Sequence, residues 1–258
     1  MSSRELIDKP LVEAIFELRW ELQQNIAGFA SDPNYRLLLG RMFDRLETSY
    51  PAHEPLPTAN LPDEMVGYTV QHRFRAEQGS WPLVQLGPGI MSVNETNSYR
   101  WPDFKAHTIE AVGHLFACYP KGDVLKISSL VLRYVDSVEL PSDNTNVCAF
   151  LEEKLKVQVK VPESFFEGNG IVSSPSHLQL HQVFESKNPA GQIQLRVSTG
   201  KREDRDSLIW ETIFQSTESD CPPMRDGFEQ WLDNGHRLVN DWFFKMIEGD
   251  LHRRFKGE

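Results

Sequence analysis

The order of secondary-structure elements expected along this chain runs twice, and this order constrains the fold more than any single motif. Each pass begins with a segment of alternating apolar and polar residues, which predicts a strand, and continues with a helix, further strands and a longer amphipathic helix. The first-pass segments are 12–22, 33–49, 67–76, 82–94 and 99–119. The second-pass segments are 127–140, 144–156, 177–185, 192–199, 208–215 and 222–255. The passes share no detectable sequence identity, so the repeat is one of element order.

The two alternating segments each predict a strand with one buried face and one solvated face. In the first segment, the apolar residues that share a parity are Val12, Ala14, Phe16, Leu18, Trp20 and Leu22. The opposite parity holds Glu13, Glu17, Arg19 and Glu21. In the second segment, the residues of the buried parity are Leu130, Leu132, Tyr134, Asp136 and Val138.

Local signals place the ends of several elements. Asp32 is a plausible N-cap for the helix at 33–49, and Asp143 or Asn144 for the helix at 144–156. The proline-rich stretch 51–62 is expected to be a loop, and Gly87-Pro88-Gly89 is interpreted as a kink or bulge within the strand 82–94. Segment 222–255 predicts one long helix whose apolar stripe, which includes Trp242, lies along the sheet as the main packing element.

Together these elements predict an α+β fold: a curved antiparallel sheet built from two pseudo-repeats, with helices on one face and a long C-terminal helix. The first half spans 1–122 and the second 123–258, and they are expected to form one compact unit. A chain of 258 residues is long enough to bury a sizeable core. Saddle-shaped and helix-grip folds are the nearest architectures by analogy.

Charge and composition limit the partners. The chain has 37 acidic and 27 basic residues and a formal net charge of −10, which argues against a protein that holds nucleic acid by neutralising phosphates. Its three cysteines, Cys118, Cys148 and Cys221, are too far apart in sequence for a zinc motif or a disulfide framework. With no apolar signal core or membrane-length apolar run, the expectation is a cytoplasmic protein without a membrane contact.

No motif for catalysis, metal binding or a cofactor stands above chance, so no catalytic residue, metal ligand or cofactor is predicted. His107, Glu110 and His114 share a helical face, but the outer histidines are about 10 Å apart along the axis. No single ion spans that distance, and a solvated polar face accounts for them. The pair His177 and His181 is likewise too far apart along a strand to share a metal ion.

A spread-out set of polar side chains is the main candidate site. These residues occupy the solvated parity of the predicted strands, where long planar side chains on rigid strands suit recognition of a partner or ligand. They are Arg19, Arg73, Gln85, Arg133, Gln179, His181, Arg196 and Glu211. The alternative interpretation is a set of cross-strand ion pairs in water, each contributing at most about 1 kcal/mol.

Several sequence segments together resemble those of a bacterial family of chains of similar length. This family is sporadically distributed among genomes and has no assigned activity. The segments are KPLVEAIFELRW at 9–20, VQLGPGIMSVN at 84–94, YRWPDF at 99–104, LRYVDSVELP at 132–141 and HRLVNDWFFKMI at 236–247. The resemblance covers nearly the whole chain. A patchy distribution implies laterally moved loci, such as antiphage defence or toxin–antitoxin cassettes. The resemblance does not assign any functional-site residues to this chain.

Three functions remain open from the sequence. The first is a non-catalytic accessory or antitoxin-like protein, whose open polar sheet face binds a protein partner from the same locus or a second copy of the chain. The second is a small-molecule or nucleotide sensor with a cavity between the sheet and the C-terminal helix. The third is an enzyme acting on nucleic acid through the arginines and histidines of the open face.

Overall fold

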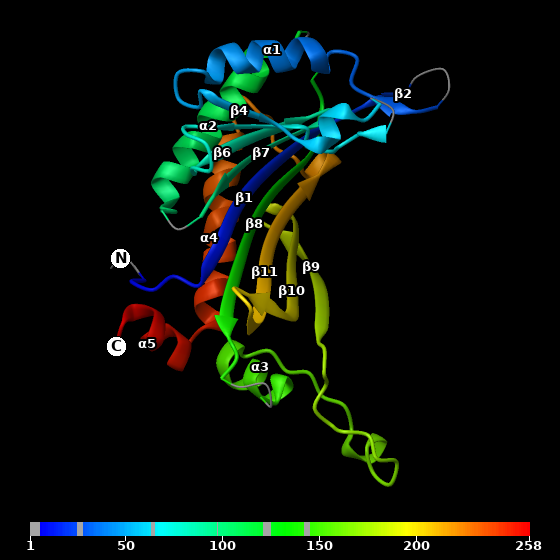
Figure 1. Cartoon of the computed structure of the whole chain (residues 1–258), viewed down its shortest axis with the longest axis vertical. Coiled ribbons are helices and arrows are strands. Elements are labelled where there is room, and N and C mark those ends of the chain that lie inside the picture. The colour runs from blue at the N-terminus through cyan, green and yellow to red at the C-terminus, as the bar shows by residue number, and fades with distance from the viewer. Residues whose placement is uncertain (1–5, 25–27, 63–64, 97, 121–124, 142–144) are drawn as a thin grey trace.

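A computed structural model of the chain describes residues 6–24, 28–62, 65–96, 98–120, 125–141 and 145–258. It has an α+β fold in which a nine-stranded antiparallel sheet packs against α-helices, of which the described residues contain five. The strand order is β4-β5-β6-β7-β1-β8-β11-β10-β9, and a separate two-stranded sheet pairs β2 with β3. Figure 1 shows the curved sheet, with α2 and α4 behind it.

The strands and helices have these bounds. The strands of the large sheet are β1 Leu11–Trp20, β4 Ala52–Pro55, β5 His72–Arg75, β6 Leu83–Gly87, β7 Ile90–Glu95, β8 Ile127–Glu139, β9 Gln179–Lys187, β10 Ala190–Arg202 and β11 Arg205–Thr217. The short pair is β2 Gln23–Gln24 and β3 Ala30–Ser31. The helices are α1 Tyr35–Leu46, α2 Trp101–Cys118, α3 Val147–Leu155, α4 Phe228–Met246 and α5 Asp250–Lys256.

The centre of the sheet is the antiparallel pair β1 and β8, which joins the N-terminal strands to the C-terminal ones. In this pair Phe16 lies opposite Leu132, and Leu18 opposite Leu130. Strand β7 flanks β1 on one side, and β11 flanks β8 on the other. The sheet is therefore continuous across the middle of the sequence.

The predicted buried parity of the two central strands is confirmed. On β1 the buried residues are Ala14, Phe16, Leu18 and Trp20, and on β8 they are Leu130, Leu132, Tyr134, Asp136 and Val138. The main core forms where this sheet face meets α1, α2 and α4. Within it the Phe16 ring lies 5.5 Å from the Phe228 ring and 6.5 Å from the Trp231 ring.

A second core cluster fills the other end of the same sheet face. It joins Trp210 and Val197 of the sheet to Phe150 of α3 and to Leu251 and Phe255 of α5. Backbone N–H groups of Ile7 and Asp8 donate to the carbonyl of Phe255, so the start of the described chain is attached to its last helix. Figure 1 shows the segment before β1 close to α5.

The C-terminal segment is not one long helix, as the sequence predicted, but two. The helix is interrupted between α4 and α5. Gly249, in this interruption, has a φ of +106°, a value that residues with a side chain rarely adopt. Trp242 is only partly buried and packs edge-on against Phe184 of β9. Trp231 of α4, 4% exposed, is the tryptophan of this helix that lies in the main core.

Two local predictions in the first half are also corrected. Gly87-Pro88-Gly89 is not a kink within one strand: Gly87 pairs with Ile90, so Pro88 and Gly89 form the turn of a β6–β7 hairpin. Proline followed by a glycine at φ +78° has the residue order of a type II turn. The proline-rich stretch 51–62 contains the edge strand β4 as well as a loop.

The helix caps differ from the predicted ones. Asn34, not Asp32, is the N-cap of α1. The Asp32 carboxylate accepts hydrogen bonds from the Asn34 backbone N–H and from Trp20 Nε1, each at 2.9 Å. It therefore joins the end of β1 to the start of α1. Asn146 caps α3, and the proposed caps Asp143 and Asn144 lie outside the described residues.

Candidate functional site

All eight residues of the predicted polar site lie on strands of the large sheet, on the face opposite the core. The pairing registers show this, because Arg133 lies opposite Ile15 and Ile213, and Arg196 lies opposite Glu211 and His181. The structure does not bring the eight together at one point. It divides them into two hydrogen-bonded groups and two separate residues.

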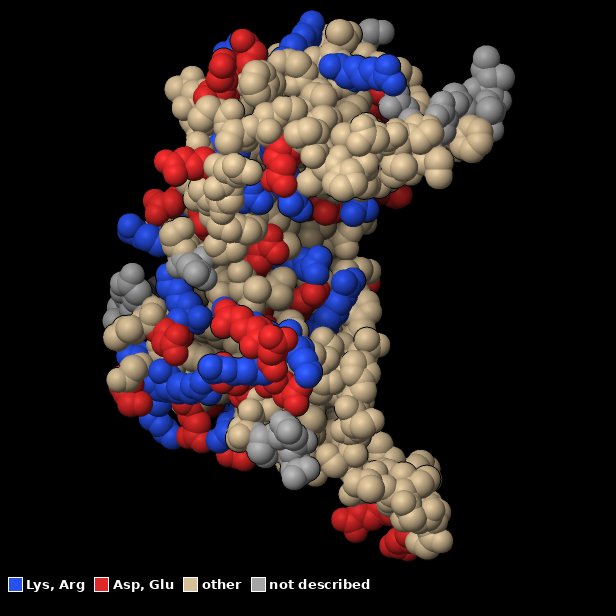
Figure 2. Space-filling model, viewed as in Figure 1, with Lys and Arg blue, Asp and Glu red and all other residues tan. Residues whose placement is uncertain are grey.

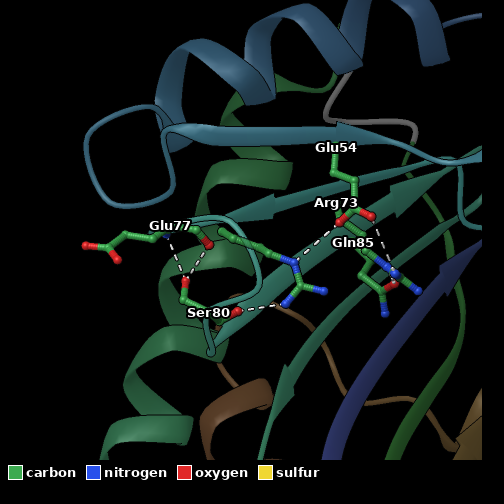
Figure 3. Close-up of polar contacts among 6 residues, drawn as sticks. Glu54, Arg73, Glu77, Ser80 and Gln85 are labelled. Carbon is green, nitrogen blue, oxygen red and sulfur yellow. Dashed lines mark hydrogen bonds and ion pairs between the residues drawn. The ribbon is translucent and has the colours of Figure 1, made fainter.

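The first group surrounds Arg73 and Gln85 on β5 and β6. Arg73 Nε donates to Gln85 Oε1 at 2.9 Å, and Figure 3 shows Arg73 directed toward Glu54 and Gln85. Gln85 Nε2 in turn donates to Asn94 Oδ1 at 3.1 Å, and Asn94 Nδ2 donates to Glu13 at 2.7 Å. This chain of amides and charges crosses four adjacent strands from β5 to β1.

The second group surrounds Glu211 on β11. Arg133 Nη2 donates to Glu211 Oε1 at 2.6 Å, and Arg196 Nη1 lies 3.8 Å from Glu211 Oε2. Nε2 of His181 lies 3.1 Å from Gln194 Oε1, which also accepts from Arg196 at 3.4 Å. The carboxylate of Glu211 therefore sits between two guanidinium groups.

Arg19 and Gln179 lie apart from both groups. Arg19 Nε donates to Glu17 at 2.7 Å, and its guanidinium lies 5.6 Å from the centre of the Tyr68 ring. Gln179 begins the edge strand β9, opposite Ser198. Arg133 and Arg196 form cross-strand ion pairs with Glu211, whereas Arg19 pairs with Glu17 of its own strand. Figure 2 shows basic and acidic side chains interspersed over the face in view.

The other face of the sheet carries a cavity of about 480 Å³, which lies within the size range of small-molecule sites. It is open to solvent on one side and is lined by the segment before β1, the start of α2, the strands β8 and β11, and helix α4. Its lining residues are Leu6, Lys9, Pro10, Leu11, Tyr99, Arg100, Trp101, Pro102, Tyr134, Asp136, Thr212, His236, Asn240, Phe243 and Phe244.

The floor of this cavity is made by β8 and β11. Tyr134 and Thr212 lie directly opposite one another in the strand pairing, and Asp136 is two residues along β8. Thr212 is 1% exposed, and its Oγ1 has no hydrogen-bond partner. Asp136 is 3% exposed, and burial raises the pKa of its carboxyl to about 8. At neutral pH Asp136 is therefore mostly protonated and can donate a hydrogen bond, which an ordinary aspartate cannot.

One wall of the cavity is a line of aromatic side chains. Tyr99 Oη donates to Tyr134 Oη at 3.1 Å, and Tyr134 Oη lies 3.0 Å from His236 Nδ1. The His236 ring stacks on Trp101, with centroids 3.8 Å apart and planes 7° from parallel. Burial lowers the pKa of His236 to about 4, so the neutral ring can accept at Nδ1 from the Tyr134 hydroxyl. The contacts hold these four rings in fixed positions.

One signal for this site is present in the sequence at Asp136. Asp136 occupies the buried parity of its strand, among Leu132, Tyr134 and Val138. A carboxylate at such a position requires either a partner or a raised pKa, and raised pKa values cluster at functional sites. Thr212 offered no comparable signal, because threonine is common in strands.

The described residues offer little other candidate chemistry. Within the described ranges, no group of three or more His, Cys, Asp or Glu side chains is placed to hold a metal ion. Glu110 and His114 approach each other on α2, at 3.6 Å between Oε1 and Nε2. None of the described helices combines the length and the apolar character needed to cross a membrane.

Comparison with known proteins leaves the family of the chain open. No family model matches it. No curated protein matches it. Among solved structures, the di-domain ARO/CYC StfQ from the steffimycin biosynthetic pathway aligns with 95% of this chain and 98% of its own at 9% identity and a TM-score of 0.22. A likeness at that TM-score carries no argument about fold or function.

Proposed function

We propose that this protein binds a small molecule in the cavity between the sheet and α4. The observation that carries the proposal is Thr212, a lining residue of the cavity whose buried hydroxyl has no hydrogen-bond partner in the protein. A buried hydroxyl left unpaired costs about 1–3 kcal/mol. A bound ligand that hydrogen bonds to it removes this cost.

Two further features of the cavity support a binding role. Its lining is more apolar than polar and includes several aromatic rings together with a few polar side chains, which is typical of small-molecule sites. The aromatic wall is held in place by the contacts of Tyr99, Tyr134, His236 and Trp101 before any ligand arrives. A site formed in advance loses less conformational freedom on binding.

The test is thermal shift against a panel of metabolites and nucleotides, with Asn240→Trp as a blocking variant. Asn240 is an exposed residue of α4 that lines the cavity, so an indole there obstructs the site without entering the core. Arg237→Trp is the control, because Arg237 is exposed on the same helix and does not line the cavity. We expect a stabilising compound whose effect is lost in Asn240→Trp and kept in Arg237→Trp. Equal shifts in both variants would place binding elsewhere.

A protein partner on the open polar face, from the same locus or as a second copy, is the second candidate. The observation in its favour is that Arg19 and Arg196 keep 41% and 47% of their side-chain surface exposed despite their ion pairs. Co-purification from the native operon tests it. Loss of a co-eluting protein on Arg133→Ala with Arg196→Ala supports this role, and a protein that elutes alone before and after substitution contradicts it.

We also infer that the halves 1–122 and 123–258 are structural repeats. What supports this is the strand order, in which β1 is followed outward by β7, β6 and β5, and β8 by β11, β10 and β9. Superposing β1, β6, β7 and α2 on β8, β10, β11 and α4 tests the inference. A common two-fold rotation is expected, and unrelated helix directions would contradict it. The boundary at 122 and 123 lies outside the described residues.

A further inference from the structure

The rim of the cavity carries positive charge. Lys9 and Arg100 are both exposed, and apart from the buried Asp136 no acidic side chain is among the lining residues. Lys9 Nζ donates to the Tyr99 carbonyl at 2.8 Å, and Arg100 Nε lies 3.7 Å from Asp103. In a chain of net charge −10, a rim with two cations and no acid among its lining residues favours an anionic group of a ligand.

The start of α2 adds to this field. Arg100 is the N-cap of this 18-residue helix, and its side chain is not engaged in capping. The next two residues, Trp101 and Pro102, line the cavity. The N-terminal end of a helix carries a partial positive charge, which favours anions there.

The floor of the cavity, unlike the rim, favours a neutral group of the ligand. Thr212 and the protonated Asp136 are neutral hydrogen-bonding groups, and neither forms an ion pair with any described cation. A charged ligand group at this depth would lose its hydration without gaining an opposite charge. A hydroxyl or carbonyl oxygen instead pairs with the Thr212 hydroxyl and accepts from Asp136.

Between rim and floor the lining is aromatic and aliphatic. Trp101, Phe243 and Phe244 face the same cavity as Leu11 and Pro10. Aromatic walls of this kind favour a flat, apolar ligand body, because rings contact one another over large areas in offset or edge-on arrangements.

We propose that the ligand is an aromatic organic acid, bound with its anionic group beside Lys9 and Arg100 and with a neutral oxygen at Thr212 and Asp136. This inference rests on the proposed function, since it names the class of molecule that the same cavity takes. The polar ends of the ligand are thereby matched to the cationic rim and the neutral floor, and its ring system to the walls.

The test uses three naphthalene probes in isothermal titration with the full chain: a hydroxynaphthoate with its groups at opposite ends, the naphthoate without the hydroxyl, and the naphthol without the carboxylate. We expect the hydroxynaphthoate to bind about tenfold more tightly than either of the others, since each lost polar contact costs about that factor.

Thr212→Val should weaken binding of the hydroxynaphthoate and the naphthol and leave binding of the naphthoate unchanged. Lys9→Gln should weaken both carboxylates, with Arg237→Gln as the matched control.

The outcomes separate the two proposals. Naphthol binding as tightly as hydroxynaphthoate, with no effect of Lys9→Gln, overturns the aromatic acid and keeps a small-molecule site. Naphthoate binding as tightly as the hydroxynaphthoate, with no effect of Thr212→Val on the hydroxynaphthoate, overturns the contact at the floor. If no probe binds at millimolar concentration, the ligand class is wrong. The proposed function is overturned only if, in addition, no compound of the wider panel gives a thermal shift that is lost in Asn240→Trp.

Discussion

At the residue scale, Thr212 is one of several described side chains with a buried polar atom that has no hydrogen-bond partner in the protein, and it lines the cavity. Thr212→Val removes the unpaired hydroxyl and keeps the branched shape, so it should raise the free energy of unfolding of the ligand-free protein by about 1 kcal/mol. Denaturant titration measures this. A loss of stability would show that the hydroxyl has a partner in solution and would weaken the case for the site.

Ser216, on the same strand, provides the contrast. Its Oγ accepts from Trp231 Nε1 at 2.9 Å and donates to the Ala190 carbonyl. Ser216→Ala leaves a buried indole N–H unpaired and should lower the free energy of unfolding by about 1–3 kcal/mol. The opposite signs of the two substitutions distinguish a satisfied hydroxyl from an unsatisfied one.

Asp136 predicts a dependence of stability on pH. Its pKa is raised from 3.8 to about 8 by burial, so the folded state keeps a proton that the unfolded state releases between those values. Stability from this group is therefore complete below about pH 4 and declines as the pH rises toward 8. Relative to wild type, Asp136→Asn should gain stability across this window, on the order of 1 kcal/mol per pH unit.

The measurement is a series of urea titrations of both proteins between pH 5 and 8. His236 acts in the opposite direction: its pKa is lowered to about 4, so its stabilisation is lost as the pH falls below about 6.5. Because His236 is present in both proteins, its contribution is expected to cancel in the difference. A constant difference over the whole range would mean that Asp136 titrates like an exposed carboxyl.

At the element scale, two helix glycines test how closely the helices pack. A Cβ at Gly235 of α4 would lie 2.8 Å from Phe214 Cδ1 and 3.1 Å from Leu132 Cδ1, whereas Gly113 of α2 has nothing within 4 Å. Gly235→Ala should destabilise by about 1–3 kcal/mol, because the gain in helix propensity is smaller than the overpacking cost. Gly113→Ala should stabilise by about 0.5–1 kcal/mol. Equal effects on the melting temperature would contradict this placement of α4.

Elements with a strong periodic pattern were predicted well, and the errors lie where one pattern continues through a break. Apolar residues recur through 222–255, yet α4 ends at Met246 and a new helix begins after Gly249, so α5 turns toward the N-terminal segment. In 82–94 the strand-like composition continues through Pro88 and Gly89, which form a tight turn. Periodicity reports which side of an element is apolar, and it is insensitive to a change of direction between two elements with similar patterns.

At the scale of the whole molecule, the β1–β8 pair predicts a single unfolding transition. The main core joins Phe16 of the first half to Leu132, Phe214 and Trp231 of the second. Neither half can bury these surfaces alone, so calorimetry of the full chain should show one transition whose calorimetric and van't Hoff enthalpies agree. Two resolved transitions would show that the halves fold independently.

The alternation of residues along the strands was enough to assign the buried and open faces, because side chains of a strand point to opposite sides with a period of two. The eight polar residues consequently lie on the open face, as predicted. Whether a given arginine there is free or paired depends on the register between strands. The contact between Arg133 and Glu211, which are 78 residues apart, arises only when β8 and β11 align.

The sequence by itself determined the class of elements, their order and the face that each strand buries, since these follow from local periodicity. Only the tertiary structure decided the cavity, because its lining comes from segments at 6–11, 99–102, 134–136, 212 and 236–244, which lie far apart in the chain. The same is true of the unpaired hydroxyl of Thr212 and the raised pKa of Asp136. A missing partner and a low dielectric are properties of what surrounds a side chain, and those surroundings exist only after the chain has folded.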